Sequence, residues 1–207
     1  MLAIVDYGVG NLFSLRHSFA AIGVEAVVTS DAEVLRQAER IVLPGVGAFE
    51  DAAKKLRESG LAQVVVEQAR NGKPLLGICL GMQMLFDKSL EYGEHEGLGL
   101  IPGTVSPIAG RIPEDYKIPH IGWNALLFRN PCPLFRYIKD GDHVYFVHSY
   151  HAEGCEENTI AQTEYGGLLT AAVARGNVYG CQFHPEKSGE TGLKILRAFA
   201  ETEAAAC

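Results

Sequence analysis

The sequence predicts an α/β fold with a mostly parallel central sheet flanked by helices and an additional antiparallel portion in the C-terminal half. Three observations support this fold class. Short β-branched runs alternate with helical patterns in the first half, which is typical of a parallel sheet covered on both faces. The second half carries mainly strand signals. An amphipathic pattern near the end predicts a last helix that returns to the sheet.

The elements of the first half follow one another in a regular order. Strands are expected at the short β-branched and apolar runs of residues 2–6, 25–29, 40–43 and 75–78. Helical patterns lie at residues 12–22, from 31 onward, and at 49–58, 61–71 and 80–87. Residues 88–103 are charged and rich in glycine, so we expect them to form an exposed loop.

The second half is expected to be largely antiparallel. Its strand signals fall at residues 104–108, 121–128, 143–147, 159–164, 168–174 and 178–183. The last helix is expected over residues 189–203, and the tail 203–207 is expected to fray. Because 207 residues with 47% hydrophobic content fit one large domain better than two, residues 1–207 are expected to form a single domain.

Charge and composition exclude several classes of function. The net charge is −7, from 25 acidic and 18 basic residues, and no basic block occurs. Binding to nucleic acid or to an anionic membrane is therefore not expected, and small molecules are the expected substrates. The apolar stretch at residues 1–5 is too short for a signal peptide, and no run reaches transmembrane length. We therefore expect a cytoplasmic protein.

The five cysteines are odd in number and widely scattered along the chain. Neither a disulfide framework nor paired zinc knuckles is indicated by their spacing. Cys181 and His184 form the most closely spaced Cys/His pair, and without a second pair at suitable spacing we expect no metal site.

Three loops are expected at the carboxyl ends of the parallel strands, at residues 6–11, 44–48 and 79–81. Ligands bind at this edge in open α/β sheets. The active site is therefore predicted there.

The segment 73–83 ends an apolar run in Gly-x-Cys-x-Gly, with the cysteine at position 79. Glycines at 77 and 81 remove side chains that would collide where a strand turns sharply into a helix, as in the nucleophile elbow of serine hydrolases. At a helix N-terminus the pKa of a cysteine falls from about 8.5 toward neutrality. Cys79 is thus a candidate nucleophile; the alternative is a buried structural cysteine.

A cysteine nucleophile needs a base, and His184 is the candidate. Pro185 favours an extended conformation at His184, and residues two apart on an extended chain face the same side. Glu186 can therefore orient the imidazole, which gives a nucleophile, a base and an orienting group. Taken alone, His-Pro-Glu is also compatible with an ordinary surface turn.

The loop 44–48 follows another apolar strand, and its glycines allow peptide orientations closed to other residues. Backbone N–H groups of Val46, Gly47 and Leu80 could stabilise an oxyanion, each contributing about 3–4 kcal/mol. A tight strand-to-helix turn is the plainer alternative. The glycines at residues 6–11 suggest a dinucleotide site, but the third glycine of that motif would fall on Phe13, so no cofactor is expected.

Three of these motifs together resemble the class I glutamine amidotransferases. They are Pro-Gly-Val-Gly at 44–47, Gly-Ile-Cys-Leu-Gly-Met-Gln at 77–83 and Gln-Phe-His-Pro-Glu-Lys-Ser at 182–188. Within that class, three further motifs resemble the glutaminase subunits of imidazole glycerol phosphate synthases. These are Asp-Tyr-Gly-x-Gly-Asn at 6–11, Pro-His-Ile-Gly-Trp-Asn at 119–124 and Phe-Val-His-Ser-Tyr at 146–150. This resemblance runs almost end to end.

The resemblance implies roles for particular residues. Cys79, His184 and Glu186 would form the catalytic triad. The positions that match the surroundings of L-glutamine are Gly47, Gln83, Glu91, Ser149 and Tyr150. The positions that match the docking surface of a β/α-barrel cyclase subunit, in a heterodimer, are Asn11, Trp123, Tyr145 and Lys187. On sequence alone, Trp123 could instead fill the core, and Lys187 could be a solvated surface lysine.

The activity implied is hydrolysis of glutamine to glutamate and ammonia, with the ammonia passed to the cyclase for histidine biosynthesis. Two other classes remain open. The chain could be a catalytically silent docking subunit, or a small cysteine peptidase or deglycase on a similar scaffold. The second is disfavoured because the histidine of such enzymes usually lies soon after the cysteine, whereas His184 lies far downstream of Cys79.

Overall fold

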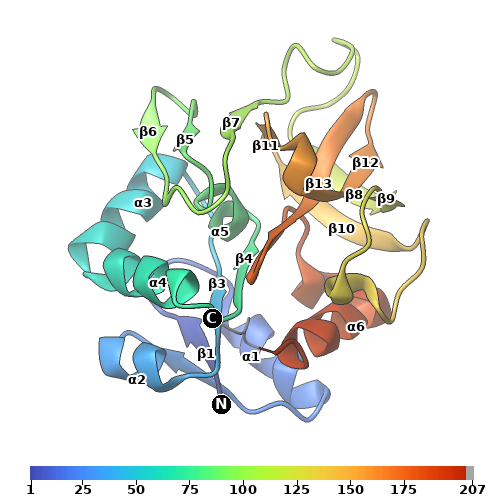
Figure 1. The fold of residues 1–207 in the computed structure, drawn as a ribbon. Helices are drawn as coiled ribbons and strands as arrows, with labels where there is room; N and C mark the ends of the chain where they lie inside the picture. The colour runs from blue at the N-terminus through green and yellow to red at the C-terminus, as the bar shows by residue number, and fades with distance from the viewer. Residues whose placement is uncertain (204–207) are drawn as a thin grey trace.

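A central eight-stranded sheet organises the protein, whose computed structural model describes residues 1–203 (Figure 1). Its strands, in spatial order, are β2 (Ala26–Thr29), β1 (Leu2–Val5), β3 (Arg40–Leu43), β4 (Leu75–Ile78), β14 (Val178–Cys181), β13 (Leu168–Arg175), β12 (Thr159–Glu164) and β9 (Leu127–Phe128). The strands from β2 to β14 pair in parallel, and β13, β12 and β9 continue the sheet in antiparallel pairing. The predicted fold class is confirmed.

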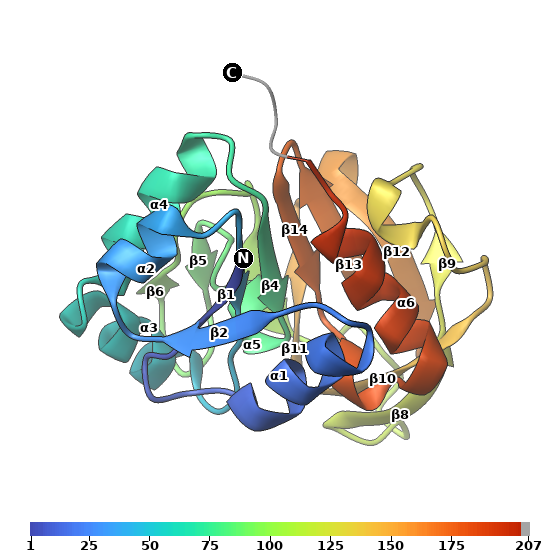
Figure 2. The same ribbon diagram turned by 90° about the horizontal axis from the view of Figure 1, so that it is seen from below.

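Helices cover both faces of the parallel strands because the strand residues alternate between two apolar clusters. Ala3 and Val5 of β1 belong to the cluster that includes residues of α2 (Ala32–Gln37), α3 (Phe49–Glu58) and α4 (Leu61–Arg70). Leu2 and Ile4 belong to the cluster of α1 (Leu12–Ala21) and α6 (Gly189–Ala200). Figure 2 shows α1 and α6 side by side in front of the sheet. Within residues 1–203, no helix is both long and apolar enough to cross a membrane.

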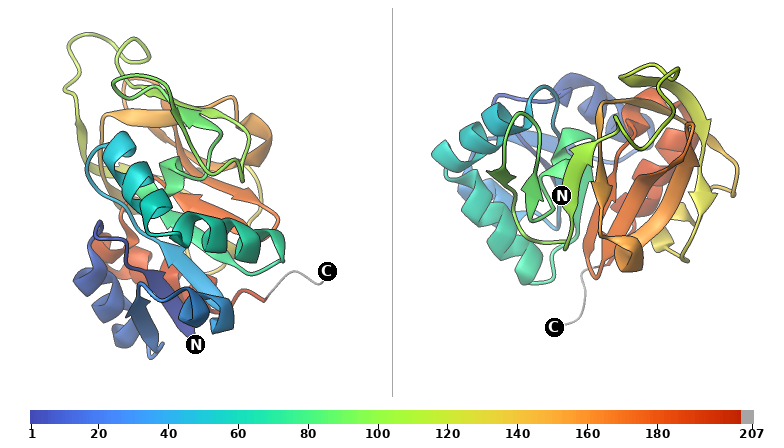
Figure 3. Two further views of the ribbon diagram at one scale, coloured as in Figure 1. Left: turned by 90° about the vertical axis from the view of Figure 1, so that its left-hand side faces the viewer. Right: turned by 90° about the horizontal axis from the view of Figure 1, so that it is seen from above.

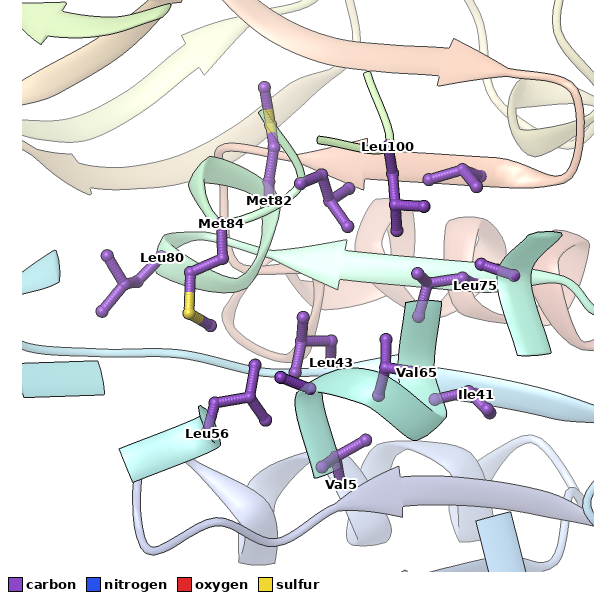
Figure 4. Packing of buried hydrophobic residues seen from close by; sticks show 14 of the residues in the cluster. Val5, Ile41, Leu43, Leu56, Val65, Leu75, Leu80, Met82, Met84 and Leu100 are labelled. Atoms are coloured by element: carbon purple, nitrogen blue, oxygen red, sulfur yellow. The ribbon is translucent and has the colours of Figure 1, made fainter. Parts of the chain in front are cut away.

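The first cluster also anchors the turn that carries Cys79. Leu80, Met82 and Met84 follow the cysteine, and their side chains are at most 3% exposed in the same cluster as Leu43 and Leu56 (Figure 4). Burying a large apolar side chain contributes about 1.5–3 kcal/mol. The segment after the nucleophile position is therefore fixed by the core rather than left as a surface loop.

Two smaller sheets complete the structure. β8 (His120–Ala125) pairs antiparallel with β10 (His143–His148). The other sheet has the order β11 (Tyr150–Glu153), β7 (Thr104–Pro107), β5 (Lys88–Ser89) and β6 (His95–Glu96). In Figure 1, β5, β6 and β7 lie above α5 (Leu80–Gln83). The segment between β7 and β8 projects from the body of the molecule, as the left view of Figure 3 shows.

Two expectations around residues 80–103 are wrong. The helix predicted over 80–87 is the single turn α5, and the predicted exposed loop 88–103 contains β5 and β6 and the buried Leu100 and Ile101. Residues 98–100, which run back past the end of α5, explain both differences. Backbone N–H groups of Leu98, Gly99 and Leu100 donate to the carbonyls of residues 84–86, and these bonds replace the continuing helix.

Smaller differences lie in the second half. The strand expected over 121–128 is divided into β8 and β9, and β11 was not expected. The last helix ends at Ala200 rather than at 203, and most of the tail expected to fray, residues 204–207, lies outside the described residues. Short 3-10 turns occur at Pro133–Phe135, Glu156–Asn158 and Pro185–Lys187 (η3).

Candidate active site

The turn from β4 into α5 carries Cys79 in a backbone conformation that few residues adopt. Its φ is 54° and its ψ −114°, a conformation that costs energy for any residue with a side chain. A Cβ at position 77 would lie 2.6 Å from the Gly81 carbonyl oxygen, and one at position 81 would lie 1.9 Å from that of Leu43. Both positions therefore need glycine, because neighbouring backbone atoms occupy the space of a side chain. This is the close packing that the sequence analysis predicted for the elbow.

His184 follows β14, the parallel neighbour of β4, and so reaches the same edge of the sheet. Its backbone N–H donates to the Tyr145 carbonyl at 3.0 Å, and its Nδ1 lies 2.8 Å from Glu186 Oε1. The side chains of His184 and Glu186 are 3% and 1% exposed. The structure therefore brings the three predicted triad residues together, with Cys79 and His184 lining one cavity and the Cys79 sulfur close enough to affect the pKa of the imidazole.

Opposing influences set the pKa of His184. Burial lowers it, whereas hydrogen bonds to Cys79 and Glu186, together with the negative charges of these two groups, raise it to about 9. The imidazole is therefore protonated at neutral pH. A protonated imidazole beside the sulfur is the arrangement that stabilises a thiolate.

The loop 44–48 lies against the elbow and is held from behind by the loop 6–11. A Cβ on Gly45 would lie 2.7 Å from the Gly81 backbone nitrogen. The Tyr7 hydroxyl donates to the Pro44 carbonyl at 2.7 Å, and burial and the nearby Cys79 charge raise the pKa of Tyr7, so this donor keeps its proton. The loop 6–11 thus supports the site from behind, whereas the predicted loops 44–48 and 79–81 line it.

A cavity of about 540 Å³ opens over the sulfur, a size typical of small-molecule sites. Every residue predicted to form the oxyanion hole or to surround glutamine lines it, namely Val46, Gly47, Leu80, Gln83, Glu91, Ser149 and Tyr150. Lys187 lines the cavity as well. Tyr92, which the sequence did not single out, lines it too, and its ring lies edge-on to that of Tyr150 with 6.5 Å between centroids.

Glu91 occupies a more specific position than the sequence indicated. Its Oε2 accepts a 2.7 Å hydrogen bond from the backbone N–H of Phe49, the first residue of α3. A carboxylate is favoured at a helix N-terminus because of the unpaired N–H groups and the dipole. Glu91 therefore ties the segment after β5 to α3 and remains at the cavity wall.

Two buried polar residues of the site received no role from the sequence. His148 lines the cavity, and its Nδ1 lies 2.8 Å from the Tyr150 carbonyl, so Nδ1 carries the proton and donates. Burial, together with the charges of His120, His151 and His184, lowers the pKa of His148 to about 3, although the bond to Tyr150 opposes this. The other residue is Gln182, which is fully buried and contacts the Cys79 sulfur.

The positions matched to a partner surface lie on one side of the cavity. Trp123 is 53% exposed, so the alternative that it fills the core is wrong. Its ring centroid lies 6.1 Å from that of Tyr145, and Lys187 Nζ lies 6.0 Å from the Tyr145 centroid. Asn11 stands at the N-terminus of α1, which contacts the η3 turn containing Lys187.

Comparison with known proteins agrees with this geometry. The family model described as "Glutamine amidotransferase class-I" matches residues 3–202, and the chain belongs to this family. A crystal structure of a glutamine amidotransferase shares the fold with a TM-score of 0.75 and 22% identity, covering 96% of this chain and 97% of that one.

Among curated relatives, the chain is similar to proteins named imidazole glycerol phosphate synthase subunit HisH. The relative from Caldanaerobacter subterraneus subsp. tengcongensis is 49% identical over 97% of this chain and 98% of its own length. The relative from Oceanobacillus iheyensis is 47% identical over the same shares. These relatives confirm the resemblance predicted from the sequence motifs.

Proposed function

We propose that this chain is the glutaminase subunit of an imidazole glycerol phosphate synthase, and that residues 1–207 act as one domain. It would hydrolyse glutamine and pass the ammonia to a β/α-barrel cyclase subunit in histidine biosynthesis. The observation that carries the proposal is the meeting of Cys79 and His184 in one cavity, with Glu186 paired to His184, in a chain 49% identical to a HisH protein over nearly its whole length.

The first half-reaction forms a thioester. The Cys79 thiolate attacks the side-chain carbonyl carbon of glutamine, and the negative charge moves to the carbonyl oxygen. N–H groups of Val46 or Gly47 and of Leu80 stabilise this oxyanion. The carbon–nitrogen bond then breaks, and the leaving nitrogen takes the proton of the His184 imidazolium and departs as ammonia. A glutamyl thioester and a neutral imidazole remain.

The second half-reaction hydrolyses the thioester. Neutral His184 takes a proton from a water molecule, whose oxygen attacks the thioester carbon. The carbon–sulfur bond breaks and its electron pair returns to Cys79 as the thiolate. Glutamic acid leaves and ionises to glutamate, and the imidazolium–thiolate pair is restored. Glu186 holds His184 Nδ1 at 2.8 Å, which keeps the other ring nitrogen available for proton transfer in both half-reactions.

The geometry supports regulation by a partner. Val46 is 41% exposed and Gly47 has a φ of +89°, so the oxyanion loop lies at the surface in a conformation that glycine favours. We propose that a peptide flip turns the Val46 N–H toward the cavity only when the cyclase docks on the side of Trp123 and Lys187. Hydrolysis of glutamine by the chain without its partner would then be slow.

The test is glutamate release by the purified chain with and without the cyclase and its nucleotide substrate. We expect weak activity alone and strong activation in the complex. Equal rates would contradict a gated site. No glutamate in either case, while the cyclase still binds, would support the silent docking subunit, and cleavage of peptides would support the peptidase.

A further inference from the structure

A chain of buried side-chain amides links the cavity wall to the nucleophile. Gln83 Nε2 lies 3.2 Å from the Tyr150 carbonyl oxygen and 3.0 Å from Gln182 Oε1. Gln182 Nε2 in turn lies 3.9 Å from Cys79 Sγ. Gln83 is 5% exposed and Gln182 fully buried. Among residues 1–203, the Cys79 sulfur is the acceptor that the Gln182 amide nitrogen meets.

The Tyr150 carbonyl determines which way both amides face. A carbonyl oxygen only accepts hydrogen bonds, so Gln83 must turn its NH₂ group toward it. That NH₂ group also faces Gln182, which must therefore present its oxygen to Gln83. The Gln182 NH₂ group is left facing the sulfur. Rotating the Gln182 amide by half a turn would set two donors against each other and an oxygen against Cys79.

We propose that Gln182 is a further catalytic residue, whose amide N–H stabilises negative charge on the Cys79 sulfur. The inference rests on the proposed function, in which this thiolate attacks glutamine. The donor is held in place because its backbone N–H donates to the Ala171 carbonyl at 2.8 Å. A separation of 3.9 Å is long for such a bond, and bonds of this kind shorten as charge develops on the acceptor.

Such a donor compensates for the short α5. With only four residues, α5 supplies little of the helix dipole that the sequence led us to expect behind Cys79. The protonated thiol can donate to the Val147 carbonyl at 4.0 Å, a bond that the thiolate loses. A nearby N–H donor offsets that loss and favours the ionised sulfur.

Gln182 also complements His184 in the reaction cycle. His184 gives up its proton in the first half-reaction and is neutral while the thioester exists. An amide N–H does not titrate, so Gln182 still donates when the carbon–sulfur bond breaks and the sulfur regains its charge. Gln182 therefore donates to the sulfur in both half-reactions, whereas His184 does so only in its protonated state.

The experiment measures how readily Cys79 ionises, without glutamine or partner. The rate of Cys79 alkylation by iodoacetamide is followed against pH in the full chain, by mass spectrometry of the peptide that contains Cys79. The variants are Gln182→Met, which keeps the length but lacks the donor, and Gln182→Glu, whose carboxylate can still accept from Gln83. The matched control is Gln68→Met, a buried glutamine on α4 outside the cavity.

We expect the alkylation midpoint to move up by about one to two pH units in both Gln182 variants, the size expected for a lost hydrogen bond to a charged group. Gln68→Met should titrate like the wild type. In complex with the cyclase, kcat/KM of Gln182→Met for glutamine should fall about tenfold at neutral pH and recover partly at higher pH.

The result that overturns the proposal is a wild-type midpoint in either Gln182 variant whose circular dichroism spectrum is native. This outcome is distinct from failure of the proposed function. If the wild-type complex releases no glutamate, glutamine hydrolysis is excluded, whereas the alkylation comparison still reports whether Gln182 stabilises the thiolate.

Discussion

The two walls of the cavity are built in different ways. On one wall, Cys79 and His184 follow neighbouring parallel strands, and the Cys79 N–H donates to the Cys181 carbonyl at 2.7 Å. On the other wall, Val46 belongs to a surface loop and is 41% exposed. The reacting groups are thus fixed by the sheet, together with the proposed oxyanion donor Leu80, whereas the proposed donors Val46 and Gly47 belong to a loop that, in our proposal, a partner reorganises. Substitutions on the first wall should abolish glutamine hydrolysis, and substitutions on the second wall should alter its activation by the partner.

The largest effect is expected for Cys79→Ala. Without the sulfur, no thioester forms, so glutamine-dependent synthesis by the complex should fall at least about a thousandfold. Ammonia-dependent synthesis should persist, because the partner receives ammonia from solution. Both are measured by product formation, with Cys132→Ala, a free cysteine outside the cavity, as the control. Loss of both activities would indicate failed folding or assembly.

Glu186→Gln should have the next largest effect. Removing the carboxylate removes one of the two groups that raise the pKa of His184, so this pKa should fall from about 9. In the wild type, acylation should decline as the pH rises through about 9, because the leaving nitrogen then lacks its proton. In the variant this decline should begin at lower pH, and kcat should drop about a hundredfold or more.

Histidine NMR titration of the same variant gives an independent measurement. The control is Glu190→Gln, an acidic residue in the first turn of α6 that should leave both the profile and the His184 signal unchanged. An unchanged His184 titration in Glu186→Gln would contradict the assignment of Glu186 as the group that orients the imidazole.

Much of the first wall could be predicted from sequence because its geometry is imposed locally. The glycines at 77 and 81 determine the elbow. The pair His184–Glu186 was also predicted, but only His184 is extended, and the 3-10 turn Pro185–Lys187, rather than an extended chain, places Glu186 beside the imidazole. The length of α5 could not be predicted, because carbonyls of residues 84–86 are taken by the N–H groups of 98–100, which are distant in sequence. Gln182 was missed for a similar reason, since its orientation depends on Gln83 and Tyr150.

A glycine-to-alanine substitution should lower the free energy of unfolding more on the first wall than on the second. In Gly81→Ala, the new Cβ would lie 1.9 Å from the Leu43 carbonyl oxygen, which should cost about 3 kcal/mol or more in free energy of unfolding. In Gly47→Ala nothing lies within 4 Å of the new Cβ, and only the φ of +89° is unfavourable, at about 1–2 kcal/mol. Urea denaturation measures both. Equal losses would contradict a tightly packed elbow beside a loosely packed loop.

A smaller effect on catalysis than for Cys79 or Glu186 is expected for Trp123→Ala, at the exposed surface beside Tyr145 and Lys187. Loss of a large exposed aromatic side chain at an interface should weaken cyclase binding by about 2 kcal/mol, or roughly thirtyfold. Isothermal titration calorimetry with the cyclase measures this. Tyr137→Ala, a 44% exposed aromatic bonded to Glu201 at the other end of α6, is the control. Equal affinity for Trp123→Ala and the wild type would place the docking surface elsewhere.

The most direct test of the account is labelling of the complex during glutamine turnover with a chloromethyl ketone analogue of glutamine. We expect one adduct per chain, on Cys79, formed in step with loss of glutaminase activity and slowed by added glutamine. Loss of activity with Cys79 unmodified, or with the adduct on another residue, would contradict the central claim that this sulfur is the nucleophile.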